Sequence, residues 1–326
     1  MSSAIKSKVI GIDIGYTTTT IAVVDIRGTI LALDSFHTSS YPQINSFVEQ
    51  ICERLVKLAE ANGGYENIRS VGVTAANANY KTGSIENAVN MPWKGEIPLA
   101  LMLRDRLGLA VAVGNDAHGT AMGEFAFGSA HGMRNFIIIS LGHGGIGSCF
   151  FSNGTPHLGH HGFAGEVGHT CVVKDGRQCT CGRKGCLEEY AAERGIIQTA
   201  REVMEESNEP SLMRSLTELT SMTIGECCDQ NDKLAWEVFR RTGYLLGIGL
   251  ANYATVINPE AIILTGEQTQ IYKWLEPSLV ESFEQHVFHN MRGKVKLVVS
   301  TLDNHQRDVL GASALAWTVK EYSLFL

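Results

Sequence analysis

The chain has 326 residues, of which 44% are hydrophobic and 34 are glycine, and its formal net charge at pH 7 is -7. A chain of this length can bury two cores of ordinary domain size. The acidic balance and the lack of a Lys/Arg block argue against nucleic acid and anionic membranes as partners. The polar start, MSSAIKSK, lacks the apolar core of a signal peptide, and no long uncharged apolar run follows it. We therefore expect a cytoplasmic protein with reduced thiols.

The first part of the chain is predicted to form a sheet covered by helices. Its opening segments are β-branched and apolar, and glycine-containing turns separate them, which predicts a three-strand meander. Apolar residues at helical spacing between Ile44 and Leu58 predict an amphipathic helix on this sheet. The strands are expected at residues 9–15, 18–25, 29–35, 71–75 and 109–114. Because helical patterns alternate with the later strands, this part has an α/β pattern.

A second round of the same pattern begins at Phe136. An apolar strand over 136–141 leads through a Gly-rich turn at 142–147 into a strand over 148–151, which repeats the opening meander. The later elements are expected as helices at 187–204, 233–256, 274–286 and 309–322 and strands at 261–265 and 295–300. The repetition predicts two similar α/β domains with a cleft between them and a hinge near Asp116. We expect residues 1–116 plus 308–326 in the first domain and 117–307 in the second.

The most informative stretch runs from Gly162 to Glu189, GFAGEVGHTCVVKDGRQCTCGRKGCLEE. It contains one imidazole and three thiols, a donor set that fits a closed tetrahedral zinc site without a water position. The ligands would be His169, Cys179, Cys181 and Cys186, and the zinc would be structural. Unlinked thiols and two disulfides are the alternatives, although the C-x-C spacing among glycine turns favours zinc. The other cysteines lack ligand spacing and are expected to be core thiols: Cys52, Cys149, Cys171, Cys227 and Cys228.

Five segments, in chain order, resemble the ROK family, which groups bacterial sugar kinases with sugar-responsive repressors. They read GIDIGYTTTTIAVVD, NDAHGTAMGE, LGHGGIG, GFAGEVGHTCVVKDGRQCTCGRKGCLEEYAA and NPEAIILTG. A further stretch, GSIENAVNMPWKGEIPL, is similar to the glucokinase branch. The resemblance spans almost the whole chain, and its zinc-bearing segment is the most specific part. It implies two actin-like, ribonuclease-H-like domains.

The resemblance also implies a sugar site with a catalytic base. By similarity, Asp116 accepts the proton of the sugar hydroxyl, and a carboxylate suffices because the transition state of phosphoryl transfer is loose. The implied sugar contacts are Asn90, Asn115, Asp116, Glu166, His169 and Glu188. In the alternative readings, Asn115 and Asp116 cap the helix beginning near Ala117, and Asn90 is a turn residue before Pro92. Likewise, Glu166 would be a solvated loop carboxylate, and Glu188 would favour the first turn of a helix.

ATP is implied on the glycine turns, with Mg²⁺ near Asp13. The residues that match the family's nucleotide turns are Asp13, Gly15, Thr17, Thr18, Gly142, His143, Gly144 and Gly266. Each glycine, taken alone, is more often just a tight turn, but three of them in the order of the family favour the nucleotide role. The turns depart from the family pattern, because Tyr16 and Thr18 replace Gly and Lys, His143 replaces Thr, and Ile146 occupies a Gly position. These departures bear on nucleotide affinity, on the identity of the phosphoryl donor and on activity itself.

The resemblance leads to an expected ATP-dependent kinase that converts a hexose, first of all glucose, to its 6-phosphate. One alternative is a catalytically weakened, sugar-binding regulatory protein; only about eight residues precede Val9, too few for a helix-turn-helix. Another is a kinase for a different hexose, such as N-acetylmannosamine, N-acetylglucosamine, fructose or allose. A nucleic-acid zinc module fits poorly with the acidic charge. Family analogy suggests a homodimer or homotetramer whose other partners are sugar and ATP.

Overall fold

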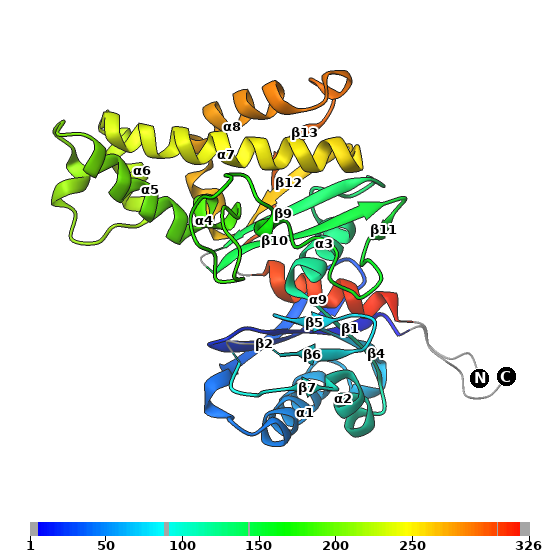
Figure 1. Ribbon diagram of the computed structural model, residues 1–326. Helices are drawn as coiled ribbons and strands as arrows, with labels where there is room; N and C mark the ends of the chain where they lie inside the picture. Colours follow the sequence, from blue (N-terminus) through cyan, green and yellow to red (C-terminus); the bar gives the residue numbers. More distant parts are fainter. Residues whose placement is uncertain (1–5, 88–90, 143, 305, 320–326) are drawn as a thin grey trace. The chain divides into compact units, whose positions relative to one another are not determined.

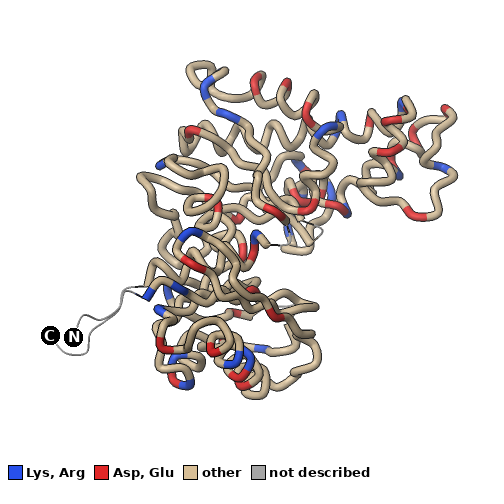
Figure 2. The backbone as a smooth tube through the Cα atoms, turned by 180° about the vertical axis from the view of Figure 1, so that it is seen from behind, with Lys and Arg blue, Asp and Glu red and all other residues tan. Residues whose placement is uncertain are grey.

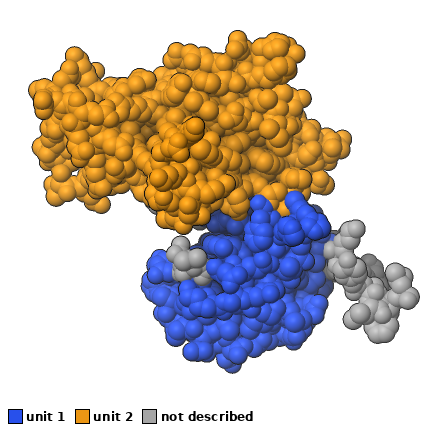
Figure 3. Space-filling view, in the orientation of Figure 1, with its two compact units in different colours: residues 1–132, 159–163, 301–326 blue, residues 133–158, 164–300 orange. Residues whose placement is uncertain are grey.

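The computed structural model describes residues 6–87, 91–142, 144–304 and 306–319. It divides the chain into two compact units, coloured separately in Figure 3. Unit 1 comprises residues 1–132, 159–163 and 301–326, and unit 2 comprises 133–158 and 164–300. The first boundary therefore falls at Gly132, later than the expected position after Asp116. The reason is that helix α3 (Asp116–Phe127) packs against the C-terminal helix and a strand of unit 1.

Unit 1 is built on a five-stranded sheet with the order β3-β2-β1-β4-β8 (Figure 1). Its strands are β1 (Lys8–Ile14), β2 (Thr18–Asp25), β3 (Ile30–His37), β4 (Ile68–Ala75) and β8 (Ala110–Gly114). The pairs β3-β2 and β2-β1 are antiparallel, whereas β1-β4 and β4-β8 are parallel. A second, three-stranded sheet consists of β5 (Ala78–Asn79), β6 (Ser84–Glu86) and β7 (Glu96–Ile97), and it was not expected.

Helices cover both faces of the main sheet of unit 1. Residues alternate between the faces with a period of two: Ile10 and Ile12 pack in one core with α1 (Ile44–Ala61) and α2 (Leu99–Leu107). Val9 packs on the opposite side, in a cluster with α9 (Arg307–Thr318). The amphipathic pattern of residues 44–58 therefore has the expected role.

Helix α9 lies unusually close to the strands beneath it. A Cβ atom added to Gly72 would lie 1.9 Å from the carbonyl oxygen of Ala312, and one added to Gly11 would lie 2.4 Å from that of Val309. The hydroxyl of Ser70 donates a hydrogen bond of 2.7 Å to the carbonyl of Ala316. The last helix thus completes the core of unit 1.

Unit 2 repeats the sheet of unit 1, with the order β11-β10-β9-β12-β13. Its strands are β9 (Phe136–Gly142), β10 (Gly145–Ser152), β11 (Thr155–Pro156), β12 (Ala261–Thr265) and β13 (Lys296–Val299). The first three strands again pair antiparallel and the last two parallel. The predicted duplication of the meander is confirmed.

The helices of unit 2 form two cores. Helices α7 (Lys233–Ile257) and α8 (Tyr272–His286) pack their apolar residues against β9 and β12. A separate helical core joins α5 (Glu193–Glu206) and α6 (Ser221–Asp229) to the first turns of α7 and α8. Short 3₁₀ helices occur at η1 (Thr38–Ser40), η2 (Tyr65–Asn67), η3 (Val167–His169), η4 (Leu212–Ser215), η5 (Glu267–Ile271) and η6 (His289–Met291).

One predicted helix is wrong in detail. The segment expected as a single helix over 187–204 consists of α4 (Glu188–Ala191) and α5, because Ala192 between them is extended, with ψ of 166°. The side chain of Arg177 donates to the carbonyls of Glu189 and Gly195 at this break. Arg177, a residue from outside both helices, therefore donates to backbone carbonyls on the two sides of the break.

Charged residues of both signs are mixed along the chain. Figure 2 shows Lys and Arg interspersed with Asp and Glu along both units. Within the part of the chain that the structure describes, no helix has both the length and the apolar character that crossing a bilayer requires.

Candidate functional site

The carboxyl ends of three parallel strands meet at one edge of the unit 1 sheet. Asp13 lies near the end of β1 and is paired in register with Thr74 of β4, which in turn is paired with Gly114 at the end of β8. The Thr74 hydroxyl donates a hydrogen bond of 2.9 Å to Asp13 Oδ1. Asp116 follows β8 by two residues. This edge is where ligand sites form in open α/β sheets.

Carboxyl groups gather at this edge, and burial disfavours their ionisation. Burial and the nearby Asp308 carboxylate raise the pKa of Asp13 to about 7, against the lowering effect of the Thr74 hydrogen bond. Burial also raises the pKa of Asp116, again with a contribution from Asp308. Asp308 lies in the first turn of α9, next to the buried side chain of Arg307. Grouped carboxylate and hydroxyl oxygens are the donors that Mg²⁺ prefers.

Asn115 and Asp116 have the helix-capping geometry that was the alternative to a sugar role. Asn115 is the N-cap of α3, and its side-chain oxygen accepts a hydrogen bond of 2.9 Å from the backbone N–H of Ala117. Oδ1 of Asp116 accepts from the same N–H at 2.8 Å. Neither bond uses Oδ2 of Asp116. Capping therefore fixes the two side chains at the helix start and leaves a carboxylate oxygen available for a ligand.

The first glycine turn connects β1 to β2 and is tied to η1. The N–H of Gly15 donates to the carbonyl of Thr18 at 3.0 Å, and the Thr38 hydroxyl donates to the carbonyl of Gly15 at 2.8 Å. The N–H of Thr38 also bonds to the carbonyl of Thr17. Tyr16, at the tip, is 66% exposed. The turn is thus held rigidly while its distinctive aromatic ring reaches solvent.

The other two glycine turns lie side by side in unit 2, because β9 and β12 are neighbouring parallel strands. Gly142 ends β9, and Gly266 follows β12 with a positive φ of 99°. A Cβ atom on Gly266 would lie 2.3 Å from the carbonyl oxygen of Leu141, so only glycine fits there. Gly144 has open space around its Cα. His143 lies outside the described residues.

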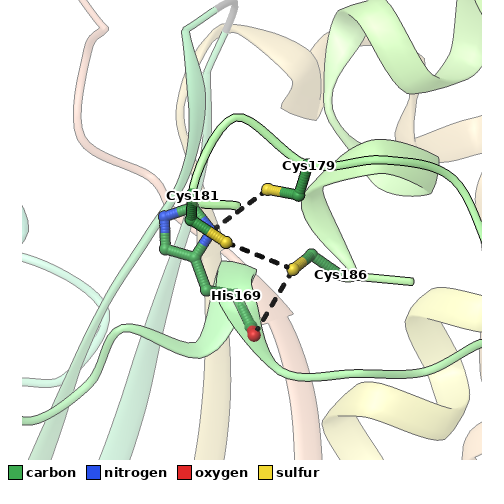
Figure 4. Close-up of side chains that lie close together, drawn as sticks. All are labelled: His169, Cys179, Cys181 and Cys186. Atoms are coloured by element: carbon green, nitrogen blue, oxygen red, sulfur yellow. Dashed lines mark hydrogen bonds between the residues drawn. The ribbon is translucent and has the colours of Figure 1, made fainter. Parts of the chain in front are cut away.

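The four predicted zinc ligands come together at one point of unit 2. Figure 4 shows the imidazole of His169 and the three thiols turned toward one another. Their ligand atoms all lie within 4.8 Å of one another. His169 Nδ1 is 3.6 Å from the sulfur of Cys179, and the sulfurs of Cys181 and Cys186 are 3.7 Å apart.

These spacings fit a tetrahedral zinc ion. Zinc bonds of about 2.3 Å to sulfur and about 2.0–2.1 Å to nitrogen place two sulfurs about 3.8 Å apart and a sulfur and a nitrogen about 3.6 Å apart. The backbone N–H of Arg183 is the main cause that lowers the pKa of Cys181 to about 6, which favours the thiolate that a metal needs, whereas burial raises the pKa of Cys179 and that of Cys186. Because Nδ1 faces the thiols, Nε2 of His169 is left for another partner.

Of the expected sugar carboxylates of unit 2, that of Glu188 lies beside Cys179 of this cluster. Glu166 is exposed and is the N-cap residue of η3, which ends at His169. Glu188 is buried in the first turn of α4, where Oε2 accepts from the N–H of Ile146 at 3.0 Å and Oε1 from Arg194 at 2.5 Å. The Glu188 carboxylate therefore braces the β9–β10 turn as well as facing the zinc loop.

Sequence reasoning missed several contributors to these sites: Thr74, Glu189, Arg194 and Asp308. Arg194 bridges Glu188 and Glu189, and the only sequence signal was two adjacent acids followed by a basic residue. Asp308 reaches Asp13 from the far end of the chain, so no local pattern could indicate it. Asn90 lies outside the described residues.

One expectation about the cysteines is wrong. Cys149, Cys227 and Cys228 are buried and Cys52 is partly buried, but Cys171 is exposed. It lies in the zinc loop, two residues after His169, where a surface segment runs beside the segment of Cys186. A surface loop offers no apolar core to cover the thiol.

The family model, the related sequences and the solved structures all point to the same family. The model of the ROK family matches residues 9–319. The chain is 30% identical to a glucokinase of Halalkalibacterium halodurans, over 96% of this chain and 94% of that protein. It is 27% identical to a xylose repressor of Bacillus spizizenii, over 94% of this chain and 76% of the repressor. It is also similar to a solved ROK glucokinase from Streptomyces griseus in complex with glucose and AMPPNP, with 30% identity, a TM-score of 0.75, and coverage of 96% of this chain and 100% of that one. The chain therefore belongs to the ROK family.

Proposed function

We propose that this protein is an ATP-dependent hexose kinase that phosphorylates the 6-hydroxyl of glucose. The observation that carries the proposal is the position of Asp116, directly after β8 at the sheet edge that also holds Asp13. The identity with a glucokinase and the likeness to a structure that holds glucose and a nucleotide support it. Hexoses with other substituents remain alternative substrates within the same reaction class.

In this proposal Asp116 accepts the proton of the attacking hydroxyl. Burial raises the pKa of Asp116, which makes its carboxylate a stronger base than that of an ordinary aspartate. The sugar hydroxyls are bound by Asn115, Glu166, His169 and Glu188. Asn90 is a further proposed contact. Carboxylate oxygens suit this task because they only accept hydrogen bonds and a sugar offers many donors.

The nucleotide is assigned to the three glycine turns. Backbone N–H groups near Gly15, Gly142 and Gly144 would hold phosphates, Gly266 would lie at the adenosine, and Thr17, Thr18 and His143 would add side-chain donors. Asp13 would hold Mg²⁺, whose charge would offset the crowded carboxylates of unit 1.

We assign a structural zinc ion to His169, Cys179, Cys181 and Cys186. It would fix the orientation of the imidazole so that Nε2 can serve the sugar. By family analogy we also propose a cytoplasmic homodimer or homotetramer, which light scattering of the purified protein would test.

The direct test is an assay of sugar phosphate with ATP, Mg²⁺ and a panel of hexoses. Asp116→Asn should lower kcat by about 10²- to 10⁴-fold, because general-base catalysis contributes that much. Asp105→Asn is the matched control, since Asp105 is an exposed acid of the same unit on α2 and away from the sheet edge. Full activity of Asp116→Asn would contradict the assignment.

A second candidate function is sugar sensing without turnover. The exposed Tyr16 and the Thr18 at the first turn, where the family pattern has Gly and Lys, favour it, as does the similarity to a repressor over 94% of this chain. Calorimetry that finds glucose binding, together with no sugar phosphate from any hexose, would select this candidate.

A further inference from the structure

An exposed cysteine outside the ligand set faces one of the zinc ligands. Cys171 and Cys186 form an isolated antiparallel bridge in which the two residues lie directly opposite each other. The flanking hydrogen bonds run from the N–H of Val172 to the carbonyl of Gly185 at 2.9 Å and from the N–H of Leu187 to that of Thr170 at 2.9 Å. Cys171 and Cys186 themselves exchange no backbone bond in this pattern, so they are a non-hydrogen-bonded pair.

This pairing has the geometry that a disulfide requires. Opposite residues of a non-hydrogen-bonded pair have Cα atoms about 4.5 Å apart and side chains on the same side. Disulfides span Cα separations of about 4.4–6.8 Å. Gly185 permits the approach, because a Cβ there would lie 1.8 Å from the carbonyl oxygen of Val173 and 3.2 Å from the sulfur of Cys171.

Exposure selects Cys171 over the other cysteines outside the ligand set. Its thiol is accessible to a solute oxidant and is held only by a weak contact of 3.5 Å to the carbonyl of Val173. Cys149, Cys227 and Cys228 are buried and Cys52 is half-buried. Cys186 is 1% exposed, so a small oxidant meets Cys171 first.

We propose that Cys171 and Cys186 form a disulfide under peroxide and that this bond ejects the zinc ion, an inference that rests on the zinc assignment of the proposed function. Hydrogen peroxide oxidises the Cys171 thiol to a sulfenic acid and is reduced to water. The Cys186 thiolate then attacks the sulfenic sulfur, the S–S bond forms, and the departing hydroxide takes a proton to become a second water.

The loss of Cys186 leaves three of the four zinc ligands. A closed four-coordinate site depends on all its ligands, so zinc leaves the loop when one thiolate is withdrawn. His169 then loses the partner of its Nδ1, and Glu188 lies only two residues beyond the new bond. Oxidation at Cys171 is therefore coupled to the proposed sugar contacts of unit 2.

The test treats reduced, zinc-loaded protein with hydrogen peroxide and follows released zinc with a chromogenic chelator. Disulfides are mapped by mass spectrometry after cleavage with trypsin and a glutamate-specific protease, which place Cys149, Cys171, Cys186 and the Cys179/Cys181 pair on four separate peptides. We expect a linked Cys171–Cys186 peptide in proportion to the zinc released, and recovery of bound zinc after thiol reductant and added zinc.

The matched variants are Cys171→Ser and Cys52→Ser, each of which removes a thiol that is not a ligand. Cys171→Ser should retain zinc when reduced and release it several-fold more slowly under peroxide, whereas Cys52→Ser should behave as the wild type. Equal release from Cys171→Ser, or a disulfide confined to Cys179, Cys181 and Cys186, would overturn the proposal. Protein purified without zinc would contradict the zinc assignment and with it the ejection step, whereas the Cys171–Cys186 disulfide is tested separately by its linked peptide.

Discussion

The protonation of the Asp13 carboxyl is linked to folding, because its pKa differs between the folded and the unfolded chain. Its pKa is raised from 3.8 to about 7, chiefly by burial and by Asp308, so between about pH 4 and pH 7 the folded protein binds more protons than the unfolded chain. The free energy of unfolding should therefore fall as the pH rises through this window. The stability that protonated Asp13 contributes is fully present below about pH 4 and is lost above about pH 7.

Asp13→Asn should remove that pH dependence. At pH 8 in EDTA the variant should be more stable than the wild type by roughly 1–4 kcal/mol, since each pKa unit corresponds to about 1.4 kcal/mol, and the gain should shrink at pH 5. Urea unfolding at the two pH values measures it, with Asp105→Asn as the control. A gain of the same size at both pH values would show that Asp13 is not the titrating group.

Cys181 provides a test of the zinc centre separate from peroxide chemistry. Its thiol is an exposed ligand, so Cys181→Ser changes little packing but removes one donor. We expect loss of zinc and weaker glucose binding with little change in ATP binding, measured by metal analysis and calorimetry. Equal weakening of both ligands would indicate that the metal supports the whole fold instead of the sugar contacts.

Single residues also show what a sequence can reveal of a site. The ligand set could be predicted because three thiols and a histidine lie within a short stretch, and the structure brings them together as predicted. The roles of Arg194 and Asp308 could not be predicted, because the fold sets their partners. Arg194 bridges two acids across a helix break, and Asp308 acts on Asp13 from the last helix. The roles of the predicted sugar and nucleotide residues remain proposals.

At the scale of elements, helix α9 packs against β1 and β4 at the shortest backbone approach described in unit 1. Gly72→Ala would force a methyl group to within 1.9 Å of the Ala312 carbonyl, which the backbone can relieve only by moving α9. We expect a loss of about 1–3 kcal/mol or more in unfolding free energy, as for other overpacked cores. Thermal unfolding measures it, with Gly144→Ala as the control because nothing lies within 4 Å of a Cβ there. Similar stability of the two variants would argue against this close packing of α9 on β4.

Helices and strands whose apolar residues recur at a regular spacing were predicted well. Features that depend on residues far away in the sequence were not. The strands at β1, β2, β4, β9 and β12 and helices α1 and α7 are confirmed close to their expected bounds. The small sheet β5–β7 has strands of two or three residues, too short to show alternation. At the break near Ala192, Arg177 donates to backbone carbonyls on both sides, a contact that no local pattern could indicate.

At the scale of the whole molecule, the chain is a duplicated α/β protein. The two sheets share strand order and direction, and the likeness to solved ROK structures confirms the expected pair of actin-like domains. The placement of α3 in unit 1 depends on packing with α9, a contact between segments almost 200 residues apart in the chain, and for that reason the sequence alone placed the boundary too early.

The contribution of α9 to unit 1 has a consequence for biosynthesis. A ribosome releases β1 and β4 early, but the helix that covers their second face is translated after residue 306. Unit 2, whose last residue is Ser300, is complete before that helix appears. During translation the nascent chain therefore holds an apolar sheet face open until its final residues emerge, and the domain begun first is the one finished last.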